Sequence, residues 1–78
     1  MNNIYIMVEF PNGNTYEVTA FDEVSLTFNT DDLAYPFYNL DDFNDEEYKF
    51  SISVSSNWKM SDNVKVSLEF IKWLLKGI

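Results

Sequence analysis

The first twenty residues contain two runs of alternating apolar and polar side chains on either side of a short turn sequence. Apolar side chains stand at every second position over residues 4–10 and again over residues 16–20. A period of two is typical of a β-strand that buries one face. Between the runs lies Pro11-Asn12-Gly13-Asn14, in which proline presets φ and Asn-Gly tolerates positive φ. The pattern predicts a β-hairpin, and therefore a sheet at the start of the fold.

Two later segments also alternate. Residues 24–28 and 48–54 carry apolar side chains at every second position, so each segment predicts one more strand. Between them, residues 29–47 break the pattern. The sequence Asn29-Thr30-Asp31-Asp32 is typical of a turn, and Pro36 disfavours helix at the residue before it. Within this stretch, residues 40–48 are compatible with a short acidic helical turn.

The last segment carries two patterns at once. Its first half, residues 64–70, alternates like a strand, whereas the second half does not. On a helix at about 100° per residue, four apolar side chains fall on one line and the charged side chains lie opposite. The four apolar residues are Val64, Leu68, Ile71 and Leu75. A cap at Ser61 or Asp62, and Gly77 after the end, complete a helical pattern. The sequence therefore favours a helix from about Asp62 to Lys76.

The order of these elements predicts an α+β fold in one domain that spans residues 1–78. The simplest two-layer arrangement is a small antiparallel sheet of about four strands, meander-like, with the C-terminal helix packed on one face. A chain of 78 residues is long enough for one domain and a small core. We expect that core to consist of Ile4, Ile6, Val8, Val18, Leu26, Ile52, Val54, Leu68, Ile71 and Leu75.

Charge is distributed unevenly along the chain. Residues 1–48 contain eleven carboxylates and no base, whereas all five lysines and the other two carboxylates follow. The net charge of −8 is thus a field of about −11 on the first part and +3 on the second. Such a field repels phosphate backbones and acidic lipid surfaces, and it attracts basic protein surfaces. We expect no direct binding to nucleic acid or membrane, and a partner with a basic surface.

The residue inventory argues against catalysis. Cysteine, histidine and arginine are absent, which removes thiol chemistry, nucleophilic triads and arginine clamps on phosphate. The two glycines, Gly13 and Gly77, form no phosphate-binding loop. Residues 41–47 are rich in oxygen donors, but they lack the glycine and the final glutamate of an EF-hand loop. We expect a non-enzymatic chain with no catalytic residue, no cofactor and no metal site.

The acidic segment, residues 31–47, is the candidate partner-binding surface. Seven of its seventeen residues are acids, and aromatic side chains lie between them. Aromatic contacts concentrate interface energy, while charges at the rim mainly change the encounter rate. Side chains two apart on an extended strand are separated by about 6.6–6.8 Å, close to the spacing of phosphates along nucleic acid. The predicted partner-binding residues are Asp31, Asp32, Tyr35, Phe37, Tyr38, Asp41, Asp42, Phe43, Asp45, Glu46 and Glu47.

These features predict electrostatic mimicry of nucleic acid. In size and composition the chain resembles small acidic inhibitors from phages and mobile elements, of the anti-CRISPR or anti-restriction type. Those inhibitors block host proteins that handle DNA or RNA. Two other interpretations stay open. In one, the acidic segment is a solvated loop with Phe37 and Phe43 packed beneath it. In the other, the chain is a small viral or bacterial accessory or assembly protein that self-associates, for example as a homodimer, through its C-terminal helix, on which Val66 and Trp73 lie beside the main apolar stripe.

The sequence also predicts a location. The absence of cysteine is more typical of a cytoplasmic protein than of a secreted one. The first residues lack the basic region of a signal peptide, and no apolar run reaches membrane-spanning length. We therefore expect a cytoplasmic protein, found in the host cytoplasm if a phage encodes it.

Overall fold

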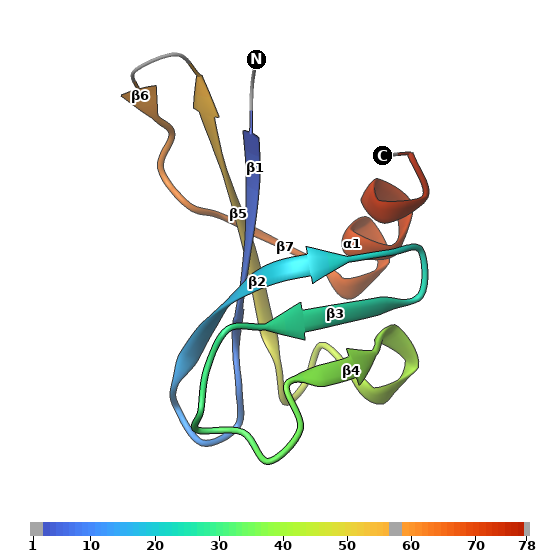
Figure 1. Ribbon diagram of the computed structural model, residues 1–78. Helices are drawn as coiled ribbons and strands as arrows, with labels where there is room; N and C mark the ends of the chain where they lie inside the picture. The colour runs from blue at the N-terminus through green and yellow to red at the C-terminus, as the bar shows by residue number, and fades with distance from the viewer. Residues whose placement is uncertain (1–2, 57–58, 78) are drawn as a thin grey trace.

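The computed structural model describes residues 3–56 and 59–77. It opens with the predicted hairpin, in which β1 (Asn3–Glu9) pairs antiparallel with β2 (Thr15–Phe21) (Figure 1). Gly13 has a φ of 89°, a left-handed conformation that glycine adopts without strain. The Phe10 N–H donates to the Asn14 carbonyl at 2.8 Å and closes the loop. The hairpin prediction is confirmed.

The sheet is larger than predicted. In the described residues it has seven strands in the order β4-β3-β2-β1-β5-β6, and β7 also pairs with β5. The prediction of about four strands is wrong. Strands β4 and β6 have only three and two residues, too few to show alternation, and β7 lies in the segment that was assigned to the helix. The meander holds from β1 to β4 only, since β5 returns to pair with β1. The strands after the hairpin are β3 (Ser25–Phe28), β4 (Phe37–Asn39), β5 (Lys49–Ser56), β6 (Lys59–Met60) and β7 (Val64–Val66).

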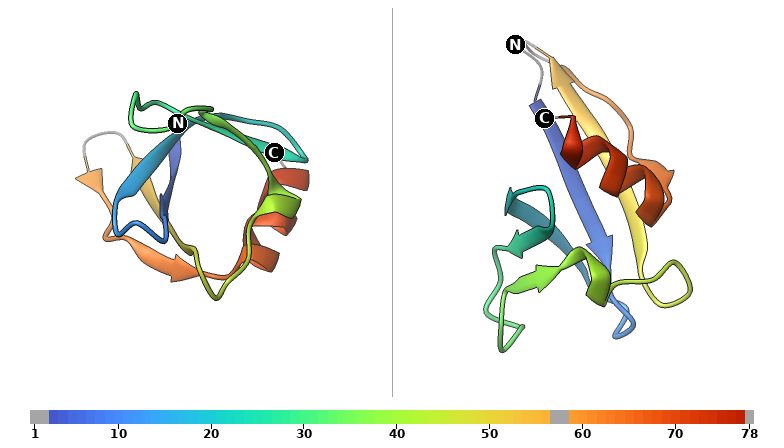
Figure 2. Two further views of the ribbon diagram at one scale, coloured as in Figure 1. Left: turned by 90° about the horizontal axis from the view of Figure 1, so that it is seen from below. Right: turned by 90° about the vertical axis from the view of Figure 1, so that its right-hand side faces the viewer.

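The sheet curls, and the helix α1 (Leu68–Lys76) lies between its two ends. Seen from below in Figure 2, the strands and the helix follow one another around a ring. In that view α1 stands between β7 and the short 3-10 helix η1 (Leu40–Asp42). A register shift between Val18 and Ala20 marks a bulge, which bends a strand and increases its twist. The prediction of an α+β fold with one C-terminal helix is confirmed.

The helix is shorter than predicted. It begins at Leu68 instead of about Asp62, because Val64–Val66 form strand β7. In that strand Val66 lies opposite Phe50 of β5. β-Branched valines favour a strand when they can pack on a sheet. The pairing with β5 is a long-range contact, and it decides between the two patterns that the segment carries.

The two ends of the helix also differ from the prediction. Ser67 caps its start, and the Ser67 hydroxyl accepts a hydrogen bond from the Phe70 N–H at 3.1 Å. Ser61 and Asp62 therefore do not cap it. At the other end, Gly77 has a φ of −91° and remains in the right-handed region. The left-handed conformation for which glycine is favoured is not used there.

Aromatic rings form the centre of the core. Phe10 packs against five other rings, with centroid separations of 5.0 to 6.2 Å and edge-to-face geometry. This geometry places the positive edge of one ring against the negative face of another. The five rings belong to Tyr16, Phe28, Tyr38, Phe43 and Tyr48. A small domain gains apolar burial efficiently in this way, because each ring buries about 150–250 Å².

The observed core lacks four of the predicted residues and contains six that were not predicted. Ile52 and Leu68 are only partly buried, Val54 is half-buried, and Ile4 is 37% exposed. Ile4 and Val54 lie opposite each other near the ends of β1 and β5 that project past α1 (Figure 1). The other six predicted core residues are buried. The buried apolar residues that were not predicted are Phe10, Tyr16, Phe28, Leu40, Phe43 and Phe50.

Candidate functional site

The acidic segment winds around one end of the molecule. It starts in the loop after β3, passes through β4 and η1, and ends in the turn before β5, in the lower half of Figure 1. None of its seven acids lies in a strand, since β4 contains only Phe37, Tyr38 and Asn39. The carboxylates of this segment therefore do not have the regular strand spacing that we compared with the spacing of phosphates.

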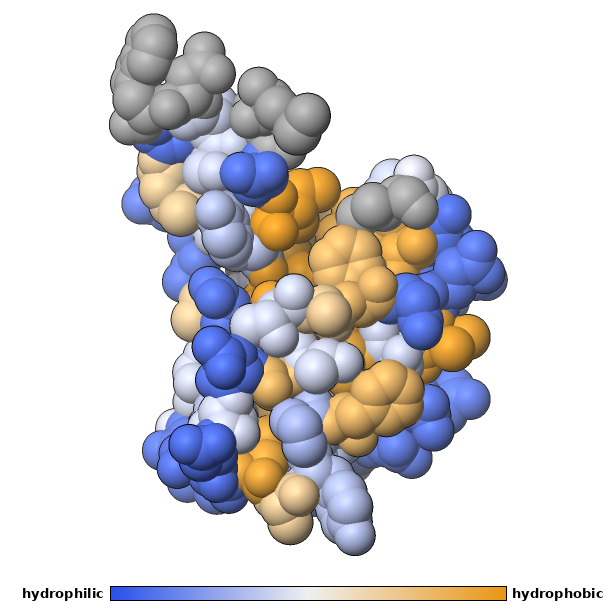
Figure 3. All heavy atoms as spheres, in the orientation of Figure 1, coloured by the Kyte–Doolittle hydropathy of each residue, from blue (hydrophilic) through white to orange (hydrophobic). Residues whose placement is uncertain are grey.

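Part of the segment is fully available at the surface. Asp31, Asp32 and Glu46 are exposed, and their carboxylates have no hydrogen-bond or ion-pair partner within residues 3–56 and 59–77. Tyr35 is 78% exposed and Phe37 is 57% exposed. Phe37 lies opposite Thr27 of β3, where Figure 3 shows apolar side chains among polar ones over β3 and β4. The segment thus combines free carboxylates with exposed aromatic rings.

Two other acids make contacts inside the segment. The Asp42 carboxylate accepts a hydrogen bond from the Asn39 N–H at 3.2 Å, where it closes the first turn of η1. The Glu47 carboxylate accepts one from the Asn44 side-chain amide at 2.9 Å. These contacts fix the path of the backbone, so both carboxylates have a structural role whether or not a partner binds.

The last two acids connect the segment to α1. The Asp45 carboxylate accepts a hydrogen bond from the Leu68 N–H at 2.9 Å. Leu68 is the first residue of α1, so this carboxylate satisfies one of the free amides at the helix start and faces the positive end of its dipole. The Asp41 carboxylate lies 3.6 Å from the Lys72 ammonium. The Asp41 side chain is 95% exposed, and an ion pair so open to water contributes little stability.

The structure corrects the predicted role of Phe43. Its ring is 6% exposed and packs at 4.9 Å from Tyr48 and 5.6 Å from Phe50, between ring centroids. A side chain buried this deeply in the core does not present a contact surface to a partner. Tyr38 is half-buried in the same cluster. The interpretation that Phe43 packs beneath the segment is confirmed, whereas the same interpretation is wrong for the exposed Phe37.

The surroundings of two titratable groups, Asp22 and Tyr48, shift their pKa values. Hydrogen bonds from the Val24 N–H and the Ser25 hydroxyl, both at 2.9 Å, lower the pKa of the Asp22 carboxyl. They do so because they stabilise the ionised form. Burial raises the pKa of the Tyr48 hydroxyl, and the negative charge of Glu47 adds to the effect. Asp22 is therefore a fixed negative charge at the β2–β3 turn.

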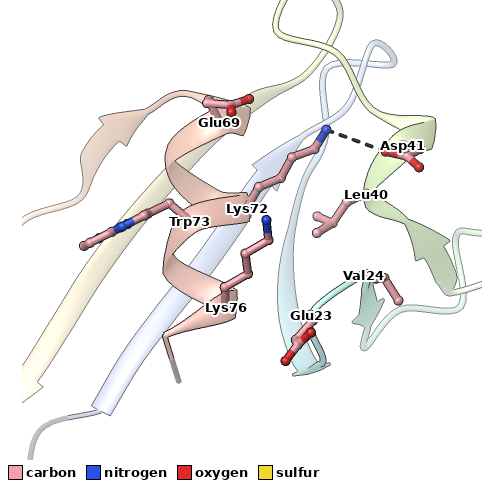
Figure 4. A pocket seen from close by; sticks show the side chains of 8 residues that line it. All are labelled: Glu23, Val24, Leu40, Asp41, Glu69, Lys72, Trp73 and Lys76. Carbon is pink, nitrogen blue, oxygen red and sulfur yellow. Dashed lines mark ion pairs between the residues drawn. The ribbon is translucent and has the colours of Figure 1, made fainter.

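A groove of about 490 Å³ separates α1 from the wall formed by η1 and the β2–β3 turn (Figure 4). We name it the α1–η1 groove. In Figure 4 the Lys72 and Lys76 side chains reach from α1 toward the wall that carries Leu40 and Val24. The Trp73 indole points to the other side of the helix. The residues that line the groove are Glu23, Val24, Leu40, Asp41, Glu69, Lys72, Trp73 and Lys76.

Sequence reasoning did not identify the α1–η1 groove. The i, i+4 spacing of Lys72 and Lys76 shows that both side chains leave the helix on one side. It does not show which element they face. The facing wall is built by residues more than thirty positions earlier, such as Leu40, and only the curled sheet brings that wall next to α1.

The described residues contain no arrangement typical of a metal centre or of a membrane-spanning helix. Over residues 3–56 and 59–77, no three carboxylates come together in a group able to hold a metal ion. No helix in that part of the chain is long and apolar enough to cross a membrane. In comparisons with known proteins, no protein-family model, no curated protein and no solved structure matches this chain.

Proposed function

We propose that this chain is a non-enzymatic, acidic protein-binding domain. It blocks a basic surface of a DNA- or RNA-handling host protein by presenting negative charge in place of nucleic acid, as phage or mobile-element inhibitors of the anti-CRISPR or anti-restriction type do. The observation that carries the proposal is the combination, in one segment, of exposed carboxylates and the exposed rings of Tyr35 and Phe37.

The two kinds of side chain have different roles in such an interface. The carboxylates of Asp31, Asp32 and Glu46, which have no partner among the residues that the structure describes, increase the encounter rate with a cationic surface, because long-range attraction acts before contact. The rings of Tyr35 and Phe37 bury apolar area after contact, and they stack on lysine or arginine side chains through cation–π attraction.

Association kinetics test this proposal. The immobilised chain is first used to capture a partner from a lysate of its native host at low salt. The triple variant Asp31→Asn, Asp32→Asn, Glu46→Gln then removes three carboxylates that make no contact within the described residues. We expect it to slow association with the captured protein by about threefold to tenfold, with little change in dissociation, because removed rim charges act mainly on encounter.

A second triple variant tests whether the association rate depends on the position of the carboxylates or only on the net charge. Glu9→Gln, Glu17→Gln and Asp62→Asn change the net charge by the same amount, at exposed positions outside the acidic segment. This variant should keep most of the association rate, and duplex DNA should compete with the wild-type chain for the partner. Equal slowing by the two triple variants, or binding insensitive to salt, would show that the segment is only a solvated loop.

A second candidate function is self-association as an assembly or accessory protein. It is supported by Trp73, which is 68% exposed and points away from the core. The Trp73 ring lies 5.5 Å from the ring of Phe70, which enlarges the apolar area on that side of α1. Val66, the other residue named for this role, is a half-buried residue of β7 and not part of the helix.

A further inference from the structure

Strand β4 is an edge strand of the sheet, and one side of its backbone faces outward. In the part of the chain that the structure describes, β4 pairs with β3 alone, and Figure 1 shows no strand on its other side. The Phe28 N–H of β3 donates to the Pro36 carbonyl at 2.8 Å. Backbone groups of successive residues point in alternating directions, so the Phe37 N–H and C=O point away from β3. Both groups are therefore available to an added strand.

The open side of β4 is accessible. Phe37 is 57% exposed, and Asn39 at the end of the strand is also exposed. Tyr35, two residues before Phe37, is 78% exposed, and Pro36 biases its backbone toward the extended form. Side chains two apart in an extended chain lie on one face. Two exposed rings therefore border the position that an added strand would take.

Charge selects among the strands that could pair with this edge. The Asp42 carboxylate accepts a hydrogen bond from the Asn39 N–H at 3.2 Å, and this N–H points to the same side as the backbone groups of Phe37. A negative charge therefore lies on the open side of β4. The chain as a whole carries a net charge of −8, so it repels a second copy of itself and attracts a basic strand.

We propose that β4 binds an extended basic segment of the partner as an added antiparallel strand, in which lysine or arginine alternates with small apolar residues. One residue of that segment exchanges hydrogen bonds with the Phe37 N–H and C=O. Backbone bonds supply affinity in strand addition, and alternate side chains supply specificity. This inference rests on the proposed function, because it takes the partner to be basic, and it names the kind of segment that the partner presents.

The alternation follows from the two faces of β4. Side chains opposite each other on neighbouring strands have Cβ atoms about 4.5–5.5 Å apart. On the outer face, a basic side chain opposite Phe37 stacks on its ring through cation–π attraction. On the inner face, the neighbour is Tyr38, which is partly buried against the core. A small apolar side chain fits beside Tyr38, whereas a charged one would lose part of its hydration there.

NMR titration of the ¹⁵N-labelled chain at low salt tests the inference. The probe is a seven-residue peptide that alternates lysine and valine and has both ends blocked. We expect saturable shifts at the amides of Phe37, Tyr38 and Asn39, with a dissociation constant on the order of 1 mM. Hydrogen exchange at the Phe37 amide should slow in the complex, because that N–H gains an acceptor.

Three further peptides separate backbone pairing from charge. N-methylation of two adjacent central residues removes an N–H from each edge of the peptide and keeps its charge. This peptide should bind about fivefold more weakly or worse, the loss expected for a backbone hydrogen bond. A peptide of the same composition with its lysines in one block should bind about threefold more weakly, because it loses the alternation that places lysine beside the ring. Replacing lysine by glutamate should abolish binding.

A pair of variants assigns the effect to the β4 edge. Phe37→Pro removes the outward N–H, whereas Phe37→Thr keeps it, and both remove the ring. Proline is tolerated at an edge position whose N–H makes no bond within the sheet. We expect Phe37→Pro to bind the alternating peptide about fivefold more weakly than Phe37→Thr. The amide spectrum of each variant shows whether it is folded, and the comparison of peptides requires neither variant.

Equal affinity for the alternating and the N-methylated peptides would overturn the inference, since charge alone would then hold the ligand. Equal binding by the two folded Phe37 variants would also overturn it, as would an absence of saturable shifts at β4 up to about 20 mM peptide. None of these results decides the proposed function, whose own test is the association rate of the captured partner with the triple variant.

Discussion

Asp22 stabilises the β2–β3 turn through a single carboxylate oxygen. That oxygen accepts hydrogen bonds from Val24 and Ser25, and the pKa of the carboxyl is lowered as a result. A group with a lowered pKa in the folded state contributes stability above its unfolded pKa and loses it as the pH falls through the folded pKa. We therefore expect this turn to lose stability as the pH falls through the folded-state pKa of Asp22.

The Asp22→Asn variant tests this contribution. Asparagine keeps an oxygen that accepts both hydrogen bonds but does not ionise. We expect the difference in unfolding free energy between the wild type and this variant to shrink when the pH is lowered from neutral to about 2. Urea denaturation at the two pH values measures it, and Glu23→Gln, an exposed neighbour, is the control. An unchanged difference at both pH values would show that Asp22 contributes no charge-dependent stability.

Burial of individual aromatic residues is a feature that the sequence does not reveal. Phe37 and Phe43 lie in the same acidic segment, yet Phe37 is 57% exposed and Phe43 is 6% exposed. The difference arises because β4 turns Phe37 outward, opposite Thr27, whereas the end of η1 directs Phe43 toward Phe50. Strand β4 is only three residues long, too short for alternation to indicate which side faces the core.

At the scale of elements, the start of α1 depends on a residue distant in sequence. Asp45 accepts a hydrogen bond from the Leu68 N–H, in addition to the local cap at Ser67. Removing a capping side chain costs about 0.5–2 kcal/mol. We expect Asp45→Ala to lower the unfolding free energy by an amount in this range and to speed hydrogen exchange in the first turn of α1.

Two matched variants isolate the contribution of that contact. Asp45→Asn keeps an acceptor and should cost less than Asp45→Ala, since it loses only the interaction of the charge with the helix dipole. Glu46→Ala, at the exposed neighbouring position, should change stability by less than about 0.5 kcal/mol. An equal loss for Asp45→Ala and Glu46→Ala would contradict the capping role.

Elements of the fold were predictable to different degrees. The hairpin of β1 and β2 was predictable because its turn residues and both alternating runs are local. Strand β7 was not, because residues 64–66 satisfy both a strand pattern and a helical one. Their pairing with residues 50–52 of β5 favours the strand over the helix, and that contact joins residues distant in sequence. The α1–η1 groove was not predictable for the same reason.

At the scale of the whole molecule, net charge and the exposed Trp73 favour opposite behaviours. A charge of −8 on 78 residues opposes self-association, whereas an exposed indole favours it. Under the proposed function we expect the chain to stay monomeric in sedimentation velocity up to about 100 µM at moderate salt, where charges within the screening length still repel.

The same measurement tests the second candidate function. Self-association through α1 would raise the apparent mass with protein concentration. This increase should persist at high salt and disappear in Trp73→Ala. Tyr35→Ala serves as the control, because Tyr35 is also a highly exposed aromatic residue but lies in the acidic segment. A rise that only Tyr35→Ala removes would place the contact between copies in that segment.

The hydrogen bond between Asp42 and Asn39 has a consequence for aggregation. Strand β4 is at the edge of the sheet. The Pro36 carbonyl accepts a hydrogen bond from the Phe28 N–H of β3, and the Leu40 N–H donates to the carbonyl of Val24, the residue before β3. Since N–H groups alternate in direction along a strand, the Asn39 N–H points to the open edge. Asp42 occupies this donor, so a strand from another molecule finds one anchor fewer and a negative charge beside it. With this donor occupied and a charge beside it, the β4 edge is a poorer template for the cross-chain strand pairing that starts amyloid growth.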